Sequence, residues 1–242
     1  MRLTPLISTA VALSVAAPIF AQEWVEFASR EDRFTCLFPT QPTVKETTYL
    51  SQHEANLPAR AYSTKQGQSR YLVTVVDYNQ AQRILTEKAK SCPAGAEPCL
   101  GGAGDEGHWR TDIRGAMDWA TWQLMKRDVK VTSFVWAAVD QVEGRQLQIT
   151  NNADHSRTFL GIFMHQNKLY ITEGTVPRGY PEPALFQQSL GWLDESGIGL
   201  RYQSYYNNNY PPPPRVDRAL RPGQGRIDAP GAVVTRKQEG GK

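Results

Sequence analysis

The sequence has few of the residues that usually mark cofactor and metal sites. It contains three cysteines and four histidines among 242 residues. It has no Gly-x-Ser-x-Gly elbow, no P-loop, and no helix with two histidines and a carboxylate. The sequence therefore lacks the common signatures of hydrolases, nucleotide-binding proteins and zinc proteases. A triad built from distant residues stays open, because sequence order does not constrain triad geometry. We therefore name no catalytic, cofactor-binding or metal-binding residue.

Long apolar runs are also missing beyond residue 21, so we expect no transmembrane segment after that point. Residues 1–21 combine a basic start at Arg2, an apolar core at 6–17 and a small residue, Ala21. This pattern is typical of a secretory signal peptide cleaved after Ala21. Its core is too short to span a bilayer, which needs about 20 residues. Residue 22 is Gln, which offers no thiol for a lipid anchor, so the expected location is periplasmic or secreted.

The basic charge is concentrated at one end of the chain. Residues 211–242 carry seven basic and three acidic side chains, whereas residues 22–210 have a net charge of about −2. A folded part with this balance lacks a nucleic-acid signature. The basic end instead suggests a weak contact with an anionic surface such as lipid headgroups or wall polymers.

Export would place the three cysteines in an oxidising compartment, where thiols pair. Cys92 and Cys99 enclose six residues, two of them proline, and this spacing favours a small disulfide loop. A zinc site would need a second such pair or nearby histidines at ligand spacing. Cys36 lies in an apolar strand-like run, and we expect a buried free thiol there rather than a nucleophile.

Alternating β-branched and aromatic residues predict an antiparallel sheet, and two amphipathic stretches predict helices that cover it. The expected class is α+β, with a single domain over residues 22–200. Predicted strands cover residues 24–27, 34–38, 44–50, 59–64, 71–78, 131–139, 146–150, 158–164 and 169–173. Helices are predicted from residue 79, over 113–126, and over 185–193.

The most apolar strands and the last helix predict the core. We expect the following residues to be mostly buried: Leu72, Val73, Val75, Phe159, Ile162, Phe163, Tyr170, Ile171, Phe186 and Leu190. Residues 201–242 change to a Tyr-, Asn- and Pro-rich and then basic composition, with too few apolar residues to offset ordering entropy. They are predicted to form a disordered tail.

Several short motifs resemble a known fold group. The run from Phe27 to Phe34 and the Phe38-Pro39 step resemble the opening strands of PsbP-like bacterial proteins. Gly144-Arg145, Arg157-Thr158-Phe159, Leu169-Tyr170-Ile171 and the 186–190 segment fit the later pattern. These proteins are relatives of an extrinsic photosystem II subunit and are built as helix–sheet–helix sandwiches. The resemblance spans about residues 24–193 and is to an exported bacterial branch of the group. It implies a non-enzymatic, partner-binding or envelope role, and it supplies no catalytic residues.

Two segments carry letters of functional motifs without their context. Residues 102–107 spell the dinucleotide fingerprint, but the expected disulfide loop precedes them and two carboxylates lie where phosphate would bind. A flexible loop is the better interpretation. Asp105, Glu106, His108 and Asp112 offer hard metal ligands, but their spacing matches no known ligand loop. We expect a solvated, charged loop.

The remaining polar and aromatic candidates each have a plainer interpretation. His53, His155 and His165 stand in polar or turn contexts and are predicted to be surface residues. Trp119 and Trp122, with Trp109 before them, would form either an aromatic ridge for sugar or peptide or a helix–sheet contact, and packing is favoured. Arg145 and Arg157, predicted on neighbouring strands, would either bind an anion or be solvated.

From the sequence we expect an exported, non-enzymatic binding or scaffold module of the bacterial cell envelope. Its partner would be an envelope protein or polymer. The alternative is an envelope hydrolase whose active site the sequence does not identify. A hydrolase would show a nucleophile, a base and an oxyanion donor converging in a pocket. A binding module would show an exposed apolar or aromatic patch.

Overall fold

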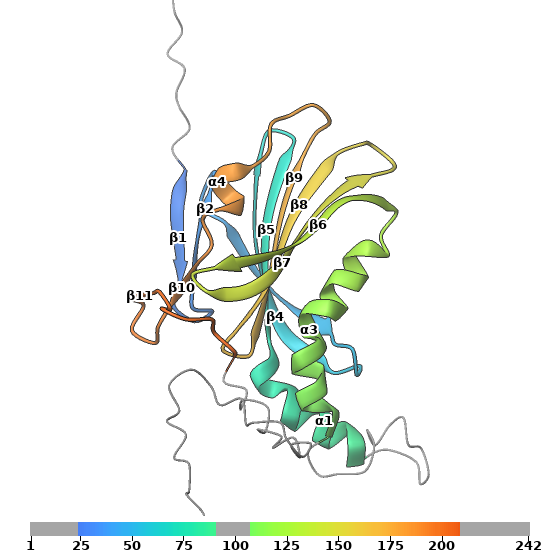
Figure 1. Cartoon of the computed structure of the whole chain (residues 1–242), viewed down its shortest axis with the longest axis vertical. Helices are drawn as coiled ribbons and strands as arrows, with labels where there is room; N and C mark the ends of the chain where they lie inside the picture. Colours follow the sequence, from blue (N-terminus) through green and yellow to red (C-terminus); the bar gives the residue numbers. More distant parts are fainter. Residues whose placement is uncertain (1–23, 91–106, 209–242) are drawn as a thin grey trace, which may run out of the picture. The chain divides into compact units, whose positions relative to one another are not determined.

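The computed structural model describes residues 24–90 and 107–208, which form two antiparallel sheets with helices beside them (Figure 1). The predicted signal peptide, the Cys92–Cys99 loop and the chain after residue 208 lie outside the described residues. The predicted α+β class is confirmed. The strands are β1 (Val25–Ser29), β2 (Phe34–Phe38), β3 (Thr43–Leu50), β4 (Asn56–Gln66), β5 (Ser69–Asp77), β6 (Val129–Val139), β7 (Val142–Asn151), β8 (Arg157–His165), β9 (Lys168–Val176), β10 (Gly191–Leu193) and β11 (Gly199–Leu200). The helices are the short η1 (Tyr78–Gln80), α1 (Ala81–Lys90), α3 (Gly107–Met125) and α4 (Ala184–Gln187).

The larger sheet has seven strands in the order β3-β4-β5-β9-β8-β7-β6, all paired antiparallel. Tight turns fix the register of its hairpins. Between β8 and β9, Gln166 and Asn167 have φ values of 50° and 56°, as a two-residue type I′ turn requires. This confirms the hairpin predicted there. Strands β3 and β6 are the two edges of the sheet.

A smaller sheet, β1-β2-β10-β11, covers one face of the large sheet (Figure 1). In β2 the side chains of Phe34, Cys36 and Phe38 point inward, because alternate residues of a strand share a face. They pack with Trp192 of β10 against the large sheet and form the aromatic core between the two layers. The members contributed by the large sheet are Tyr62, Tyr71, Val73, Val75, Ala137, Val142, Phe163 and Tyr170.

Helices α1 and α3 lie on the opposite face of the large sheet (Figure 1). Ile113, Ala116, Ala120 and Leu124 of α3 are buried at helical spacing. The helix predicted over residues 113–126 is confirmed, but it begins earlier, at Gly107. The first helical segment begins at Tyr78, one residue before the predicted start at residue 79. The side chain of Asp77 accepts a hydrogen bond from the Asn79 amide and caps η1, which continues into α1. No helix in residues 24–90 and 107–208 is long and apolar enough to cross a membrane.

The last predicted helix is wrong in its extent. Only Ala184–Gln187 is helical, and the chain then forms strand β10. Trp192 explains the change, because it pairs with Phe34 in β2 and donates a hydrogen bond from Nε1 to the Val139 carbonyl at 2.9 Å. Burying this ring between the sheets outweighs the local helical spacing. Leu72 is also wrongly placed in the predicted core, since it is only half-buried. The predicted residues that are buried are Val73, Val75, Phe159, Ile162, Phe163, Tyr170, Ile171, Phe186 and Leu190.

The domain boundary predicted at residue 200 is too early. Residues 201–208 pack on the domain: Tyr206 bridges to Val142, and its amide donates to the Gln141 carbonyl at 3.0 Å. Asn208 is buried and exchanges hydrogen bonds with Asn167. Tyrosine and asparagine side chains thus order a segment whose composition predicted disorder.

A substitution at Phe163 tests whether this side chain is central to the core between the sheets. It is 2% exposed and packs against Trp192, and a Cβ added at Gly144 would lie 2.2 Å from its Cδ1. Phe163→Ala should lower the free energy of unfolding by about 3–5 kcal/mol, measured by urea denaturation. Leu185→Ala, at a side chain that is 55% exposed, should change it by less than about 0.5 kcal/mol. Similar losses in the two variants would contradict the packing described here.

Candidate functional site

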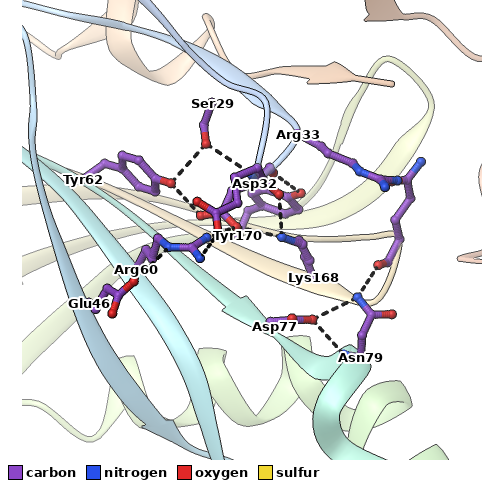
Figure 2. A network of polar contacts seen from close by, with 12 residues as sticks. Ser29, Asp32, Arg33, Glu46, Arg60, Tyr62, Asp77, Asn79, Lys168 and Tyr170 are labelled. Atoms are coloured by element: carbon purple, nitrogen blue, oxygen red, sulfur yellow. Dashed lines mark hydrogen bonds and ion pairs between the residues drawn. The ribbon is translucent and has the colours of Figure 1, made fainter. Parts of the chain in front are cut away.

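A buried carboxylate, Asp32, lies at the centre of a polar network between the two sheets (Figure 2). Asp32 is in the turn after β1 and is 2% exposed. Its Oδ1 accepts hydrogen bonds from Arg60 Nη1 at 2.9 Å and from Lys168 Nζ at 2.7 Å. Its Oδ2 accepts from the Tyr62 hydroxyl at 2.6 Å. Strands β4 and β9 therefore hold the β1–β2 turn through a single carboxylate.

Hydrogen bonds to the same turn complete the network. The Asp32 amide donates to Ser29 Oγ at 3.1 Å, and the Tyr170 hydroxyl donates to the Asp32 carbonyl at 2.7 Å. Ser29 Oγ also lies 3.1 Å from the Tyr62 hydroxyl. Because that hydroxyl donates to Asp32, Ser29 is the donor in this contact. Every polar atom of Asp32 thus has a partner, as burial demands.

The charges of the network favour ionised Asp32. Burial raises its pKa, but hydrogen bonds from Lys168 and Tyr62 and the charge of Lys168 outweigh burial, so the pKa is lowered. Burial and the hydrogen bond to Asp32 raise the pKa of Tyr62. A cavity of about 330 Å³ adjoins the network, lined in part by Glu31, Glu46 and Arg60. Since Asp32 is ionised and fully paired, the arrangement is suited to holding the sheets together rather than to transferring a proton.

Of the sequence candidates, the structure brings together His53, His108 and Asp112. The rings of His53 and His108 stack, with centroids 4.1 Å apart, and Asp112 lies one helical turn beyond His108 in α3. Asp112 is 0% exposed, which corrects the expected solvated loop, while Asp105 and Glu106 lie outside the described residues. The helix that begins at Gly107 buries one face against the sheet, and Asp112 is on that face.

The surroundings of Asp112 indicate a structural contact with the β3–β4 turn. Burial raises its pKa, and contacts with Ser51, His53 and Gln52 partly oppose that rise. Among the described residues, neither carboxylate oxygen has a hydrogen-bond partner. Although His53 and His108 stack near Asp112, no three His, Cys, Asp or Glu side chains in residues 24–90 and 107–208 are arranged to hold a metal ion.

The prediction that all three turn histidines are exposed is wrong for His165. His155 is exposed as expected, but His165 is 0% exposed. Its Nε2 lies 2.8 Å from the Tyr202 hydroxyl, and its ring packs against Trp192 and Tyr206. Burial lowers the pKa of His165 to about 4. The segment after residue 200 covers this hairpin end, and local sequence carries no signal of that.

The three tryptophan candidates differ in their contacts and exposure. Trp119 donates a hydrogen bond to the Leu50 carbonyl at 3.1 Å and lies 4.9 Å from Trp122, whose ring Lys126 covers at 3.4 Å. Trp119 therefore ties α3 to β3, as the packing interpretation predicts, and Trp122 is 45% exposed. Trp109 is half-buried.

Arg145 and Arg157 do lie on neighbouring strands, β7 and β8. Arg145 pairs with Glu143 at 3.1 Å, and Arg157 donates to the Tyr180 carbonyl. Both guanidinium groups therefore have protein partners, which does not favour an anion site shared between them.

The feature that sequence reasoning missed is the β6 edge. Strand β6 pairs with β7 on one side, and no strand of residues 24–90 or 107–208 pairs with its other side. Residues 131–139 contain no charged side chain, and Phe134, Val135 and Trp136 are each 50% exposed or more. Tyr205 adds a ring 6.0 Å from that of Trp136. A nine-residue uncharged run beside a turn was visible in the sequence, but its position at an edge was not.

The two edges of the large sheet differ in chemistry. Edge strand β3 carries Lys45 and Glu46, which is how many proteins protect an exposed edge. In β6 a bulge between Val131 and Ser133 interrupts the pairing, and the regular, uncharged part runs from 133 to 139. A cavity of about 880 Å³ opens beside its end, lined by Ala138, Val139, Trp192 and Leu200 among others. The β6 edge thus combines unpaired backbone groups, apolar side chains and an adjacent cavity.

Comparison with solved structures finds a match of fold. The solution structure of cyanobacterial PsbP (CyanoP) from Synechocystis sp. PCC 6803 aligns over 74% of this chain and 98% of that one. The TM-score is 0.40 and the sequence identity is 8%. The name of that protein is the name of the fold group that the sequence resembles. The sequence matches no family model and no curated protein.

Asp32 gives a test of the network. Asp32→Asn leaves Lys168 and Arg60 facing a neutral amide, and should lower the free energy of unfolding at pH 7 by about 3 kcal/mol. The lowered pKa makes the stabilisation by Asp32 complete above its unfolded pKa of about 3.9, and it is lost as pH falls through the folded value. The wild type should therefore lose stability relative to the variant below about pH 4, in urea unfolding at several pH values.

The exposed Asp140 provides the control, since Asp140→Asn should leave the pH dependence of the wild type unchanged. An Asp32→Asn variant with wild-type stability at pH 7 would show that the network holds nothing together.

Proposed function

We propose that the chain is an exported binding module of the bacterial cell envelope, which pairs its β6 edge with an extended segment of another protein. The observation that carries the proposal is the uncharged edge of residues 133–139 with exposed Phe134, Val135 and Trp136. An unprotected edge strand presents a row of backbone donors and acceptors that an added strand can satisfy.

The chemistry of the edge specifies the partner. With no charge on residues 131–139, a partner strand gains by carrying apolar side chains and loses by carrying buried charge. The cavity beside Val139 has room for a large side chain of that strand. We infer an extended, largely apolar segment of an envelope protein, rather than a polymer, as the occupant.

The enzyme alternative has less support. Cys36 is buried, and burial raises the pKa of its thiol to about 12, which leaves little thiolate at neutral pH. His165 is buried and bonded to Tyr202. Neither residue is placed to act as a nucleophile or a general base.

Export and the ends of the chain complete the proposal. A signal peptide of residues 1–21 would direct the protein to the periplasm or the medium, and Cys92 and Cys99 would then form a disulfide. The net charge of +4 on residues 211–242 would add a weak, salt-sensitive contact with an anionic surface.

Site-specific photo-crosslinking in intact cells tests the β6 edge. A crosslinking residue at position 134 should give one discrete adduct with another envelope protein. The same residue at position 44 of β3 should not, although Phe134 and Val44 are about equally exposed, at 50% and 48%. Adding Val135→Lys should lower the adduct yield about tenfold, because docking would bury an unpaired charge.

Circular dichroism should show that the Val135→Lys variant is folded, since Val135 is half exposed. Equal adducts at both positions, or an adduct made of two copies of this chain, would contradict the proposed partner.

Peptide mapping of the exported protein without reduction tests the thiols. Cys92 and Cys99 should be recovered in one linked peptide. Cys36, which is 0% exposed, should react with an alkylating reagent only after denaturation. Alkylation of Cys92 or Cys99 in the native protein would show that the disulfide is absent.

A further inference from the structure

A second surface, remote in sequence from β6, has the features of a ligand site. A cavity of about 690 Å³ lies over β4, β5, β8 and β9, on the sheet face that α3 also covers. Arg127, just beyond α3, reaches this face and bonds Glu173 of β9 at 2.6 and 3.3 Å. The volume is in the range of small-molecule sites, which measure about 300–1,000 Å³.

Two cations of neighbouring strands, Lys65 and Arg70, lie opposite each other at the cavity. Lys65 of β4 is directly opposite Arg70 of β5 in the strand register, and like charges in such pairs are destabilising. Neither forms an ion pair with a carboxylate of the described residues. Asp154 lies close enough to Arg70 for the Arg70 charge to help lower the Asp154 pKa, after the hydrogen bonds that Asp154 makes with Ser156.

The one carboxylate that lines the cavity does not balance these charges. Glu173 is paired with Arg127, and its side chain is 14% exposed. Among the described residues, the lining therefore holds three cations and one carboxylate, and Lys65 and Arg70 have no carboxylate of the lining as a partner. The repulsion between these two exposed cations is a cost to the free protein that a bound anion would reduce.

Hydroxyl and amide groups form the rest of the polar lining. Arg70 of β5 is paired with Thr175 of β9, and Thr175 is paired with Thr158 of β8. The hydroxyls of the two threonines lie 3.0 Å apart. These groups donate and accept hydrogen bonds at the level of the sheet, beside the two cations. The further members of this kind are Gln41, Thr43, Ser63, Thr64 and Asn151.

We propose that this cavity binds a carboxylated sugar. Lys65 and Arg70 would pair with the carboxylate, and the hydroxyl row of Thr175, Ser63 and Thr43 would hydrogen-bond the sugar hydroxyls. Thr158 is 3% exposed and supports Thr175 through their hydrogen bond. A purely ionic site would not need the hydroxyl row, and a neutral sugar site would not need the two unpaired cations. The site is independent of the β6 edge and of the proposed function.

Calorimetric titration of the full chain with three probes tests the site. Trigalacturonate carries sugar hydroxyls and carboxylates, maltotriose carries hydroxyls alone, and citrate carries carboxylates alone. Trigalacturonate should bind most tightly, with affinity falling as salt rises. Lys65→Gln and Arg70→Gln should each weaken that binding about tenfold, whereas Arg83→Gln at an exposed position of α1, away from the cavity lining, should not.

The free protein supplies a second readout. Because Lys65 opposes Arg70, Lys65→Gln should raise the Tm of the unliganded chain while it weakens binding. A stability gain with a binding loss is the result expected of a charge kept for a ligand. The proposal is overturned if trigalacturonate does not bind, if citrate or maltotriose binds equally well, or if Lys65→Gln leaves its affinity unchanged.

Discussion

The ionised carboxylate of Asp32 is the constraint on which the packing of the two sheets depends. A carboxylate that is 2% exposed is tolerable only when cations and hydroxyls surround it, and those groups come from β4 and β9. The β1–β2 turn is therefore fixed over the large sheet, and β2 leaves it with Phe34, Cys36 and Phe38 facing the core. Trp192 of β10 pairs with Phe34 of β2. The position of the β1–β2 turn therefore determines where the aromatic side chains of β2 and β10 meet the large sheet.

Local pattern was enough to predict most of the fold. Most of the nine long strands and the first two helices were predictable because alternating or 3.6-residue spacing reflects one buried face, as in β2, β5 and α3. The edge strands β3 and β6 bury almost nothing, and their β-branched and aromatic composition was the signal there. The last helix was not predictable over its full extent, since Trp192 leaves the helical pattern for a pairing with Phe34 that is distant in the sequence. The same holds for Leu72, whose strand was identified correctly. The Leu72 side chain projects from a part of the large sheet that the helices do not cover.

The functional surfaces were harder to predict than the core, for a physical reason. Asp32, Arg60 and Lys168 look like ordinary surface charges in sequence, and only the meeting of three distant segments makes them a buried group. His165 was expected at the surface because its turn is polar, but Tyr202 and Tyr206 close over it from a segment that composition alone described as disordered. Charge and exposure depend on tertiary neighbours, which a single sequence does not reveal.

The contrast between the two edge strands limits how this protein can assemble. Growth of a sheet by strand addition from molecule to molecule needs two accepting edges, one at each end. Here β3 presents Lys45 and Glu46, whereas β6 is uncharged from residue 131 to 139. Strand addition at β6, as proposed, would therefore leave the charged β3 at the far edge of the sheet, where a further strand is disfavoured. The proposed complex would then stop at one added strand per chain rather than grow from molecule to molecule.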